Sequence, residues 1–226
     1  MTQRRKRGHP GGIFLTLEGP EGSGKSTQIS FLTTTLRQAG YSVVSSREPG
    51  GTKMAEAIRQ TLLSGSSNEA ITPETEALLV LAARSQHVAH MIRPALARGS
   101  IVLCDRFADS TLAYQGFGRG LSLSWLERAN RTATGGLMPH LTLLLDIPVS
   151  RGLARRRHAR GSRNRLDRES VKFHERVRRG FLTLASRTPR RIKIINADRP
   201  VNVVRAEIEA LVLGWLRTRT RRSGTG

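Results

Sequence analysis

A glycine-rich loop follows directly on a short apolar run near the start of this chain. Residues 13–18 are apolar and β-prone, and residues 19–26 read G-P-E-G-S-G-K-S. A strand, a G-x-x-x-x-G-K-S loop and a helix form the context in which a phosphate-binding loop is expected. Glycines carry no Cβ, so successive backbone N–H groups turn inward around a polyphosphate at the positive end of the following helix. The sequence therefore predicts a nucleoside triphosphate site, with an ordinary turn between strand and helix as the alternative.

The polar residues of this loop have distinct expected contacts. Lys25 adds positive charge at the β- and γ-phosphates. Ser26 offers a hydroxyl to Mg²⁺, a metal that keeps most of its water and takes few protein ligands. The residues expected to bind the triphosphate in this part of the chain are Gly19, Gly22, Ser23, Gly24, Lys25, Ser26 and Thr27.

Short apolar runs alternate with helical stretches along the chain. Strands are expected at 13–18, 42–46, 101–105, 141–146 and 191–196, and helices at 26–39, 56–63, 73–97, 122–134, 169–186 and 201–217. Near-continuous apolar runs are typical of parallel strands covered on both faces. The expected fold class is therefore α/β, with a five-stranded parallel sheet flanked by helices and ligands at the carboxyl ends of the strands.

The charge of the chain is concentrated in three segments. Residues 4–7 and 217–222 contribute +4 each and residues 151–168 contribute +7, which is fifteen of the net +21. We expect one domain at 12–216 between basic tails at 1–11 and 217–226, and the tails predict non-specific attraction to polyanions. Specific nucleic-acid recognition is disfavoured, because the sequence has no known module for it and aromatic residues make up only 4%.

The sequence also predicts where the protein resides. No apolar run approaches the length of a membrane span, and the basic N-terminus lacks the apolar stretch of a signal peptide. The single cysteine, Cys104, falls in an expected buried strand and excludes an intrachain disulfide. A soluble, cytoplasmic protein is therefore expected.

Two further motifs follow expected strands. Residues 47–52 read R-E-P-G-G-T, and Arg47 offers a planar guanidinium to a phosphate. After the third strand, Asp105 stands where such enzymes hold Mg²⁺ through water, and Arg106 supplies a second guanidinium.

The order and spacing of four motifs resemble those of the thymidylate kinases. The motifs are G-P-E-G-S-G-K-S-T, R-E-P-G-G-T, D-R-F-A-D-S-T-L-A-Y-Q-G-F-G-R-G and F-H-E-R-V-R-R-G-F, and the likeness extends over residues 12–216. The resemblance implies the P-loop nucleoside monophosphate kinase fold and a homodimer. It also implies Mg²⁺-dependent transfer of the γ-phosphoryl group of ATP to dTMP, giving dTDP.

The resemblance assigns expected roles to matching residues. Glu21 matches an acid that contacts the deoxyribose 3′ hydroxyl and the metal region, and Arg47 and Arg106 match arginines around the acceptor phosphate. Lys25, Glu21 and Arg106 are thus expected catalytic residues, and Ser26 and Asp105 the metal ligands. The residues expected to bind dTMP are Glu21, Arg47, Pro49, Val80, Arg84, Arg106, Ser110, Thr111, Tyr114 and Gln115.

With Gly22 the chain resembles one branch of the family. In that branch a glycine follows the loop acid, and a lid at about 151–168 supplies the arginine that assists transfer. Counting back eight residues from Phe173, as in the family, gives Arg165, preceded by Asn164 where the family has an aspartate. Arg165 is the expected catalytic arginine, and a solvated basic loop is the alternative. The other expected ATP contacts are Arg157, Arg160 and Asn196.

One departure from the family concerns the base. The family usually has a phenylalanine stacked on thymine at the position of Val80. Losing a stacked ring costs about 0.5–1.5 kcal/mol, so weaker dTMP binding is expected. A kinase for another or modified pyrimidine nucleotide is the alternative, and a P-loop protein that binds polyanions through its tails is a less favoured one.

Overall fold

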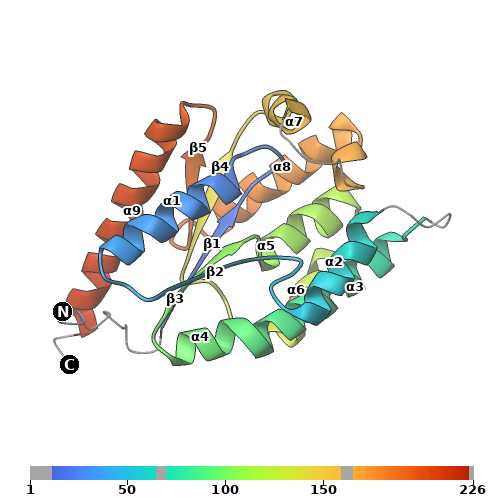
Figure 1. Cartoon of the computed structure of the whole chain (residues 1–226). Coiled ribbons are helices and arrows are strands. Elements are labelled where there is room, and N and C mark those ends of the chain that lie inside the picture. Colours follow the sequence, from blue (N-terminus) through green and yellow to red (C-terminus); the bar gives the residue numbers. More distant parts are fainter. Residues whose placement is uncertain (1–11, 65–69, 159–164, 224–226) are drawn as a thin grey trace.

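One parallel sheet runs through the centre of the molecule (Figure 1). The computed structural model describes residues 12–64, 70–158 and 165–223. Within them the sheet has five strands in the order β2-β3-β1-β4-β5. All five expected strands are confirmed to within one residue at each end. They are β1 Ile13–Glu18, β2 Val43–Arg47, β3 Ile101–Asp105, β4 Leu141–Asp146 and β5 Ile192–Asn196.

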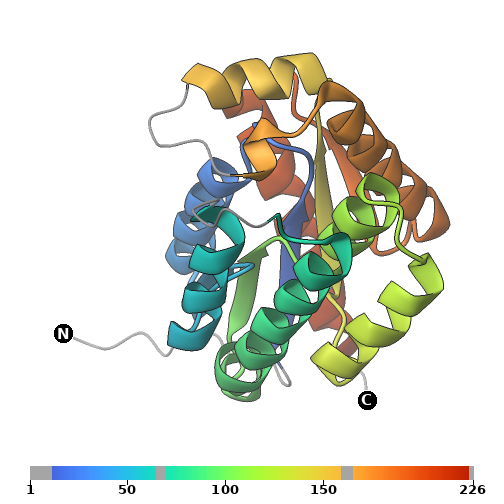
Figure 2. The same ribbon diagram turned by 90° about the vertical axis from the view of Figure 1, so that its right-hand side faces the viewer.

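Helices cover both faces of this sheet (Figures 1 and 2). The long ones begin close to capping residues, such as Thr72, Ser122 and Ser170, whose hydroxyls accept backbone N–H groups of the first turn. The helical elements are α1 Lys25–Gln38, α2 Lys53–Ser64, α3 Pro73–His87, η1 Val88–Ile92, α4 Arg93–Ala97, α5 Ala108–Thr111, η2 Leu112–Gly118, α6 Leu123–Thr134, α7 Val149–His158, η3 Leu166–Arg168, α8 Val171–Arg187 and α9 Val201–Ser223. In the described part of the chain, no helix is long and apolar enough to cross a membrane.

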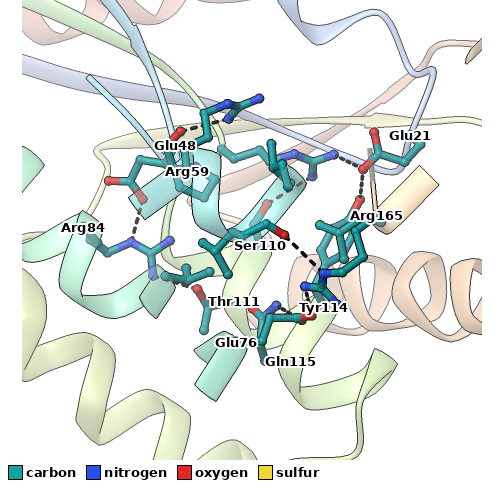
Figure 3. A pocket seen from close by; sticks show the side chains of 16 residues that line it. Glu21, Glu48, Arg59, Glu76, Arg84, Ser110, Thr111, Tyr114, Gln115 and Arg165 are labelled. Atoms are coloured by element: carbon teal, nitrogen blue, oxygen red, sulfur yellow. Dashed lines mark hydrogen bonds and ion pairs between the residues drawn. The ribbon is translucent and has the colours of Figure 1, made fainter. Parts of the chain in front are cut away.

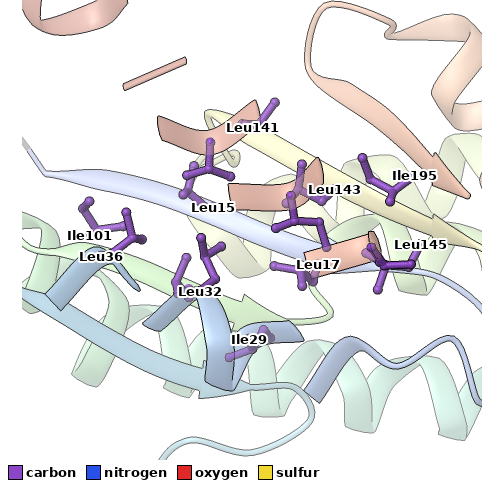
Figure 4. Close-up of a cluster of buried hydrophobic side chains, with 14 of the residues drawn as sticks. Leu15, Leu17, Ile29, Leu32, Leu36, Ile101, Leu141, Leu143, Leu145 and Ile195 are labelled. Carbon is purple, nitrogen blue, oxygen red and sulfur yellow. The ribbon is translucent and has the colours of Figure 1, made fainter. Parts of the chain in front are cut away.

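The alternation of side chains along β1 divides the core in two. Ile13, Leu15 and Leu17 face α1 and α9 in the largest apolar cluster, part of which is drawn in Figure 4. Phe14 faces the opposite side, where it packs with η1 and α4. Since side chains alternate along a strand, Glu18 lies on the Phe14 side. A carboxylate thus ends the central strand at the ligand edge, on the face opposite α1.

Proline interrupts the helix that was expected as a single element at 73–97. Pro94 has no N–H, and its ring excludes the carbonyl of the preceding turn. The ladder therefore widens to π geometry over η1, where the Arg93 N–H bonds to the Val88 carbonyl, and returns to α geometry in α4.

Three helical segments differ from expectation. Helix α7 occupies the first half of the expected lid, because arginine is a good helix former even where little is buried. Helix α9 continues through the start of the expected C-terminal tail to Ser223. The π-helix η2 lies within the D-R-F motif, and its Gly118 leaves room for the Phe173 ring, which a Cβ would approach to 2.7 Å.

Candidate active site

Two adjoining pockets lie at the carboxyl ends of the central strands. The loop pocket is lined by Glu21, Gly22, Gly24, Lys25, Ser26, Thr27, Arg47, Glu48, Arg59, Asp105, Arg106 and Arg156. The side pocket, drawn in Figure 3, is lined by Glu21, Glu48, Pro49, Arg59, Leu62, Leu63, Glu76, Val80, Arg84, Arg106, Ser110, Thr111, Tyr114, Gln115, Arg165 and Leu166. Residues common to both form the boundary between the pockets, namely Glu21, Glu48, Arg59 and Arg106.

The phosphate loop wraps around its own lysine. Gly24, at φ 88°, caps α1 in the left-handed conformation that glycine adopts without strain. Lys25 Nζ donates to the carbonyls of Gly19 and Pro20 at 3.0 and 2.9 Å. Burial and the nearby charge of Arg106 lower the pKa of Lys25 to about 8. The ammonium is therefore held inside the loop, at the floor of the loop pocket.

Gly22 brings the loop into contact with α7. A Cβ at Gly22 would lie 2.0 Å from the Gly152 carbonyl oxygen, and a Cβ at Gly152 would lie 2.3 Å from the Glu21 carbonyl oxygen. The backbone at Gly22 also has φ 68°, which strains any other residue. The two segments thus touch backbone to backbone, and neither position has space for a side chain.

A hydroxyl and a carboxylate meet at the edge of the loop pocket. Ser26 Oγ donates to Asp105 Oδ2 at 2.6 Å. These are hard oxygen ligands, and Mg²⁺ takes few of them from a protein and keeps its water otherwise. Among the residues that the structure describes, no three histidines, cysteines or acids gather into a metal site. The donor set thus fits a hydrated Mg²⁺ and no fully caged metal.

Arg106 connects the two pockets. Its backbone is in the left-handed region at φ 72°, which directs the guanidinium back toward the phosphate loop. Nη1 donates to Gly19 O at 2.9 Å and Nη2 to Glu21 Oε1 at 2.9 Å. Burial would raise the pKa of Glu21, but the charges of Arg106 and Lys25 and a hydrogen bond from Tyr114 outweigh it and bring the pKa to about 2. An ionised Glu21 therefore faces the boundary of the pockets.

Glu18 lies beneath this arginine and was not expected from the sequence to have a role. Its carboxyl accepts the Phe107 N–H at 2.7 Å and the Ser110 hydroxyl at 2.5 Å. Burial, with repulsion from Asp109, raises the pKa of Glu18 to about 8, although Ser110, Arg106 and Phe107 oppose the shift. A neutral carboxylic acid therefore fixes the loop after β3 at neutral pH.

Glu18→Gln is expected to flatten the pH dependence of stability. In the native protein Glu18 keeps a proton between about pH 4.5 and 8 that the unfolded chain releases, so the free energy of unfolding falls as pH rises through that window. Glutamine cannot ionise, so its slope should be shallower by up to about 1.4 kcal/mol per pH unit. Urea unfolding at three pH values measures the two slopes, and parallel curves for the two proteins would contradict the prediction.

The inner end of the side pocket is built around a buried arginine. Arg84 is 1% exposed, and its guanidinium donates to Glu48 Oε2 at 2.7 Å. Nη1 donates to the Thr111 hydroxyl and to Asn130 Oδ1 at 2.7 and 2.6 Å. The pocket thus has a fixed cationic end beside the apolar side chain of Val80.

Most of the expected acceptor residues gather in the side pocket, and they come from several elements (Figure 3). Arg47 is an exception, because it lines only the loop pocket and pairs with Glu56 at 3.1 Å. Arg59 lines both pockets instead and donates to the Pro49 carbonyl at 2.8 Å. No motif marked Arg59 or Glu56, since both lie on an ordinary amphipathic helix. Expected residues that line the side pocket are Glu21, Pro49, Val80, Arg84, Arg106, Ser110, Thr111, Tyr114 and Gln115.

The arginine expected at the ATP phosphates lies elsewhere in this structure. Arg165 lines the side pocket rather than the loop pocket, because its Nη2 donates to Glu76 Oε2 at 2.5 Å. Among the lid residues that the structure describes, the arginine that lines the loop pocket is Arg156, whose Nε donates to both oxygens of Asp167 at 3.1 Å. Arg157 is exposed and lines neither pocket. Arg160 and Asn164 fall outside the described residues.

Asn196 ends β5, and β4 lies between β5 and the strand that precedes the phosphate loop. Its side-chain oxygen accepts the Asp198 N–H at 2.9 Å, and it lines neither pocket. The loop that it begins touches α7, since Arg155 donates to the Ala197 carbonyl at 2.9 Å.

Comparisons with known proteins agree with this geometry. Residues 17–208 match the family model described as thymidylate kinase. A thymidylate kinase of Thermomicrobium roseum is 54% identical over 93% of this chain and 98% of that relative. One from Pseudomonas putida is 50% identical over 90% of this chain and 96% of that relative. The crystal structure of a thymidylate kinase from Ehrlichia chaffeensis, 32% identical, superposes with a TM-score of 0.72 over 90% of this chain and 99% of the other.

Proposed function

Since this chain belongs to the thymidylate kinase family and transfers the γ-phosphoryl group of ATP to dTMP, we propose that the side pocket takes dTMP and the loop pocket the triphosphate of ATP. The observation that carries this assignment is the shared boundary of the pockets. Arg59 and Arg106 line both, so two cations stand where the donor and acceptor phosphates meet. Phosphoryl transfer needs the attacking and leaving oxygens in line, with negative charge neutralised around them.

On the donor side, this chain supplies charge and a place for the metal. Lys25 at the floor of the loop pocket binds the β- and γ-phosphates, and Arg156 at its wall adds a guanidinium. Ser26 and Asp105 would hold Mg²⁺, which when bound neutralises charge on the phosphate oxygens. The spacing from Phe173 predicts Arg165 on the donor side. Because Arg165 contacts Glu76, we assign it to the acceptor side instead.

On the acceptor side, this chain orients the nucleotide. Arg106 holds the dTMP phosphate, and the carboxylate of Glu21 accepts a hydrogen bond from the sugar hydroxyl. Its low pKa supports that role, because it keeps Glu21 an acceptor throughout the physiological range. Arg84, Thr111 and Gln115 surround the base, with Val80 against its face.

A coupled assay of ADP formation against a panel of nucleoside monophosphates tests the assignment. We expect dTMP to have the highest kcat/KM, with dUMP lower because it lacks the 5-methyl group. Purine monophosphates and CMP should be poor acceptors. A higher kcat/KM for a 5-substituted dUMP than for dTMP would favour the alternative of a modified pyrimidine as the natural acceptor.

Val80→Phe is expected to strengthen dTMP binding. The added ring can stack on thymine, and stacked pairs contribute about 0.5–1.5 kcal/mol, which is about a two- to twelvefold lower KM for dTMP. The kcat should change little, because the base is remote from the transferred group. Val80→Leu, which adds apolar volume without a ring, is the matched control, and an equal effect of the two substitutions would contradict stacking.

We also propose that two copies associate through α2 and α3. These helices lie together, and each exposes a large apolar side chain, Met54 at 59% and Leu78 at 56%. Burial of these side chains against the same face of a second copy would form a two-fold interface, the commonest arrangement of homodimers. The molecular mass in sedimentation equilibrium checks the proposal, and a monomer at micromolar concentration would contradict it.

The division of the chain remains a proposal as well. We take residues 12–216 as the kinase unit, with a lid at 151–168, although α9 continues beyond that boundary. Non-specific polyanion binding is supported only by the charge of the terminal sequences. If polyanion binding were the main role of the protein, it would survive removal of the Lys25 ammonium.

A further inference from the structure

Glu76 on α3 is a buried carboxylate that the transfer step does not use. Its side chain is 2% exposed, and three donors from two segments converge on it. Two of these donors, Gln115 and Arg165, are drawn with it in Figure 3. Gln115 Nε2 donates at 2.7 Å, Arg119 Nη2 at 2.9 Å and Arg165 Nη2 at 2.5 Å. Burial would raise the pKa of Glu76, but these hydrogen bonds outweigh it and lower the pKa. Glu76 is therefore ionised, and both of its carboxylate oxygens accept hydrogen bonds.

One of these donors, Arg165, belongs to residues 165–169, which we call the wall segment. Arg165 and Leu166 line the side pocket. The Arg165 Nε donates to the Leu62 carbonyl at 3.1 Å, which brings the segment to the end of α2. At its other end Glu169 pairs with Arg119 at 2.6 Å. The wall segment is thus attached to Glu76 at one end directly and at the other through Arg119.

Arg119 is itself held firmly. Its guanidinium lies 4.6 Å from the centre of the Phe173 ring, and it pairs with both Glu76 and Glu169. The two carboxylates raise the pKa of Arg119 against the effect of burial. A guanidinium held in this way has one orientation. Glu76 therefore also fixes, through Arg119, the position of Glu169 at the far end of the wall segment.

The remaining donor, Gln115, comes from a different element of the pocket wall. Gln115, on η2, lines the side pocket, and its amide nitrogen is engaged by Glu76. Because an amide has distinct donor and acceptor ends, this hydrogen bond fixes which end is offered to a ligand. A single carboxylate therefore orients groups from two different segments that line the same pocket.

We propose that Glu76 is a positioning residue for dTMP, which holds Gln115 and the wall segment around the acceptor without touching the reacting atoms. The inference rests on the proposed assignment of the side pocket to dTMP. It assigns Arg165 to acceptor binding, in contrast to the catalytic role expected from its spacing in the sequence.

Glu76→Gln tests this role, because glutamine keeps the size but cannot balance two guanidinium groups. We expect the KM for dTMP to rise about tenfold with kcat within about threefold of the native value. Arg165→Ala should raise the KM for dTMP by less, because it leaves the contacts of Glu76 with Gln115 and Arg119 in place. The double variant should be no worse than Glu76→Gln alone, since that substitution already removes the contact with Arg165. Glu74→Gln, an exposed glutamate on the same helix, is the control and should leave both constants unchanged.

Several outcomes would overturn the inference. An unchanged KM in Glu76→Gln would do so, as would effects of the two substitutions that multiply in the double variant. A loss of several hundred-fold in kcat at constant KM in Arg165→Ala would place that arginine at the donor phosphates instead. If Glu76→Gln does not fold, Arg165→Ala alone decides, because its side chain is 21% exposed and removable.

A third variant separates this inference from the assignment of the pocket. Val80→Glu places a charged group on the apolar wall of the side pocket, against the expected base, and should raise the KM for dTMP sharply. If it does so while Glu76→Gln has no effect, only the inference about Glu76 fails. If it leaves the KM for dTMP unchanged, the assignment of the pocket fails, and the inference fails with it.

Discussion

Lys25→Ala is expected to lower kcat by about 10³-fold or more, since one preorganised charge on a transferring phosphoryl group contributes on this scale. Lys25 is 7% exposed and donates to two carbonyls of the loop, so its ammonium stands in a fixed position before ATP arrives. A charge positioned in advance needs no reorganisation during transfer. The KM for dTMP should change little, because Lys25 does not line the side pocket.

Steady-state kinetics with both substrates varied measures this loss. Lys172→Ala, which removes an exposed lysine of α8, is the matched control for a change in net charge. ATP binding to the native protein should weaken as pH rises above about 8, where Lys25 loses its proton, and the alanine variant should lack that dependence. A kcat within tenfold of the native value would show that Mg²⁺ and arginines alone neutralise the phosphates.

Arg106→Lys is expected to lower kcat/KM for dTMP by about a hundredfold, although it conserves the charge. The guanidinium reaches Gly19 and Ser110 with Nη1 and Glu21 with Nη2, and the single nitrogen of a lysine cannot occupy both of these positions. The left-handed backbone at φ 72° strains lysine and arginine equally, so backbone strain does not explain the expected loss of activity in Arg106→Lys.

The kinetic pattern distinguishes this role from a general loss of structure. The defect of Arg106→Lys should appear with dTMP, while ATP binding, measured directly by calorimetry, should stay within about threefold. Arg98→Lys, at an exposed arginine that follows α4, serves as the control. Equal losses of affinity for both nucleotides would show instead that Arg106 chiefly supports the phosphate loop.

The sheet and the phosphate loop were predictable because each is encoded by neighbouring residues. Mainly apolar runs of five or six residues fix β1, β3 and β4, and the spacing of Gly19, Gly24 and Lys25 fixes the loop. The D-R-F motif likewise identified Asp105 and Arg106, since a residue that directly follows a parallel strand must lie at the ligand edge.

The side pocket was less predictable because its residues depend on distant partners. Counting from Phe173 located Arg165 along the chain, but Glu76, 89 residues away, decides which pocket the side chain enters. Arg59 and Glu76 lie on helices whose pattern identifies a buried face and gives no sign of chemistry. The burial of Glu18 could not be read from β1 either, since its partner loop follows a different strand.

The contact between Gly22 and Gly152 bears on how enzymes of this kind diverge. The resemblance describes two arrangements, with the assisting arginine either in the loop or in the lid. An arginine at position 22 would drive a side chain into the backbone of α7, so the exchange cannot begin with one substitution in the loop. We expect α7 to have to move away from the loop before an arginine at position 22 is tolerated. A protein at that stage would have an assisting arginine neither in the loop nor in the lid. The two arrangements would then be separated by a barrier in sequence space.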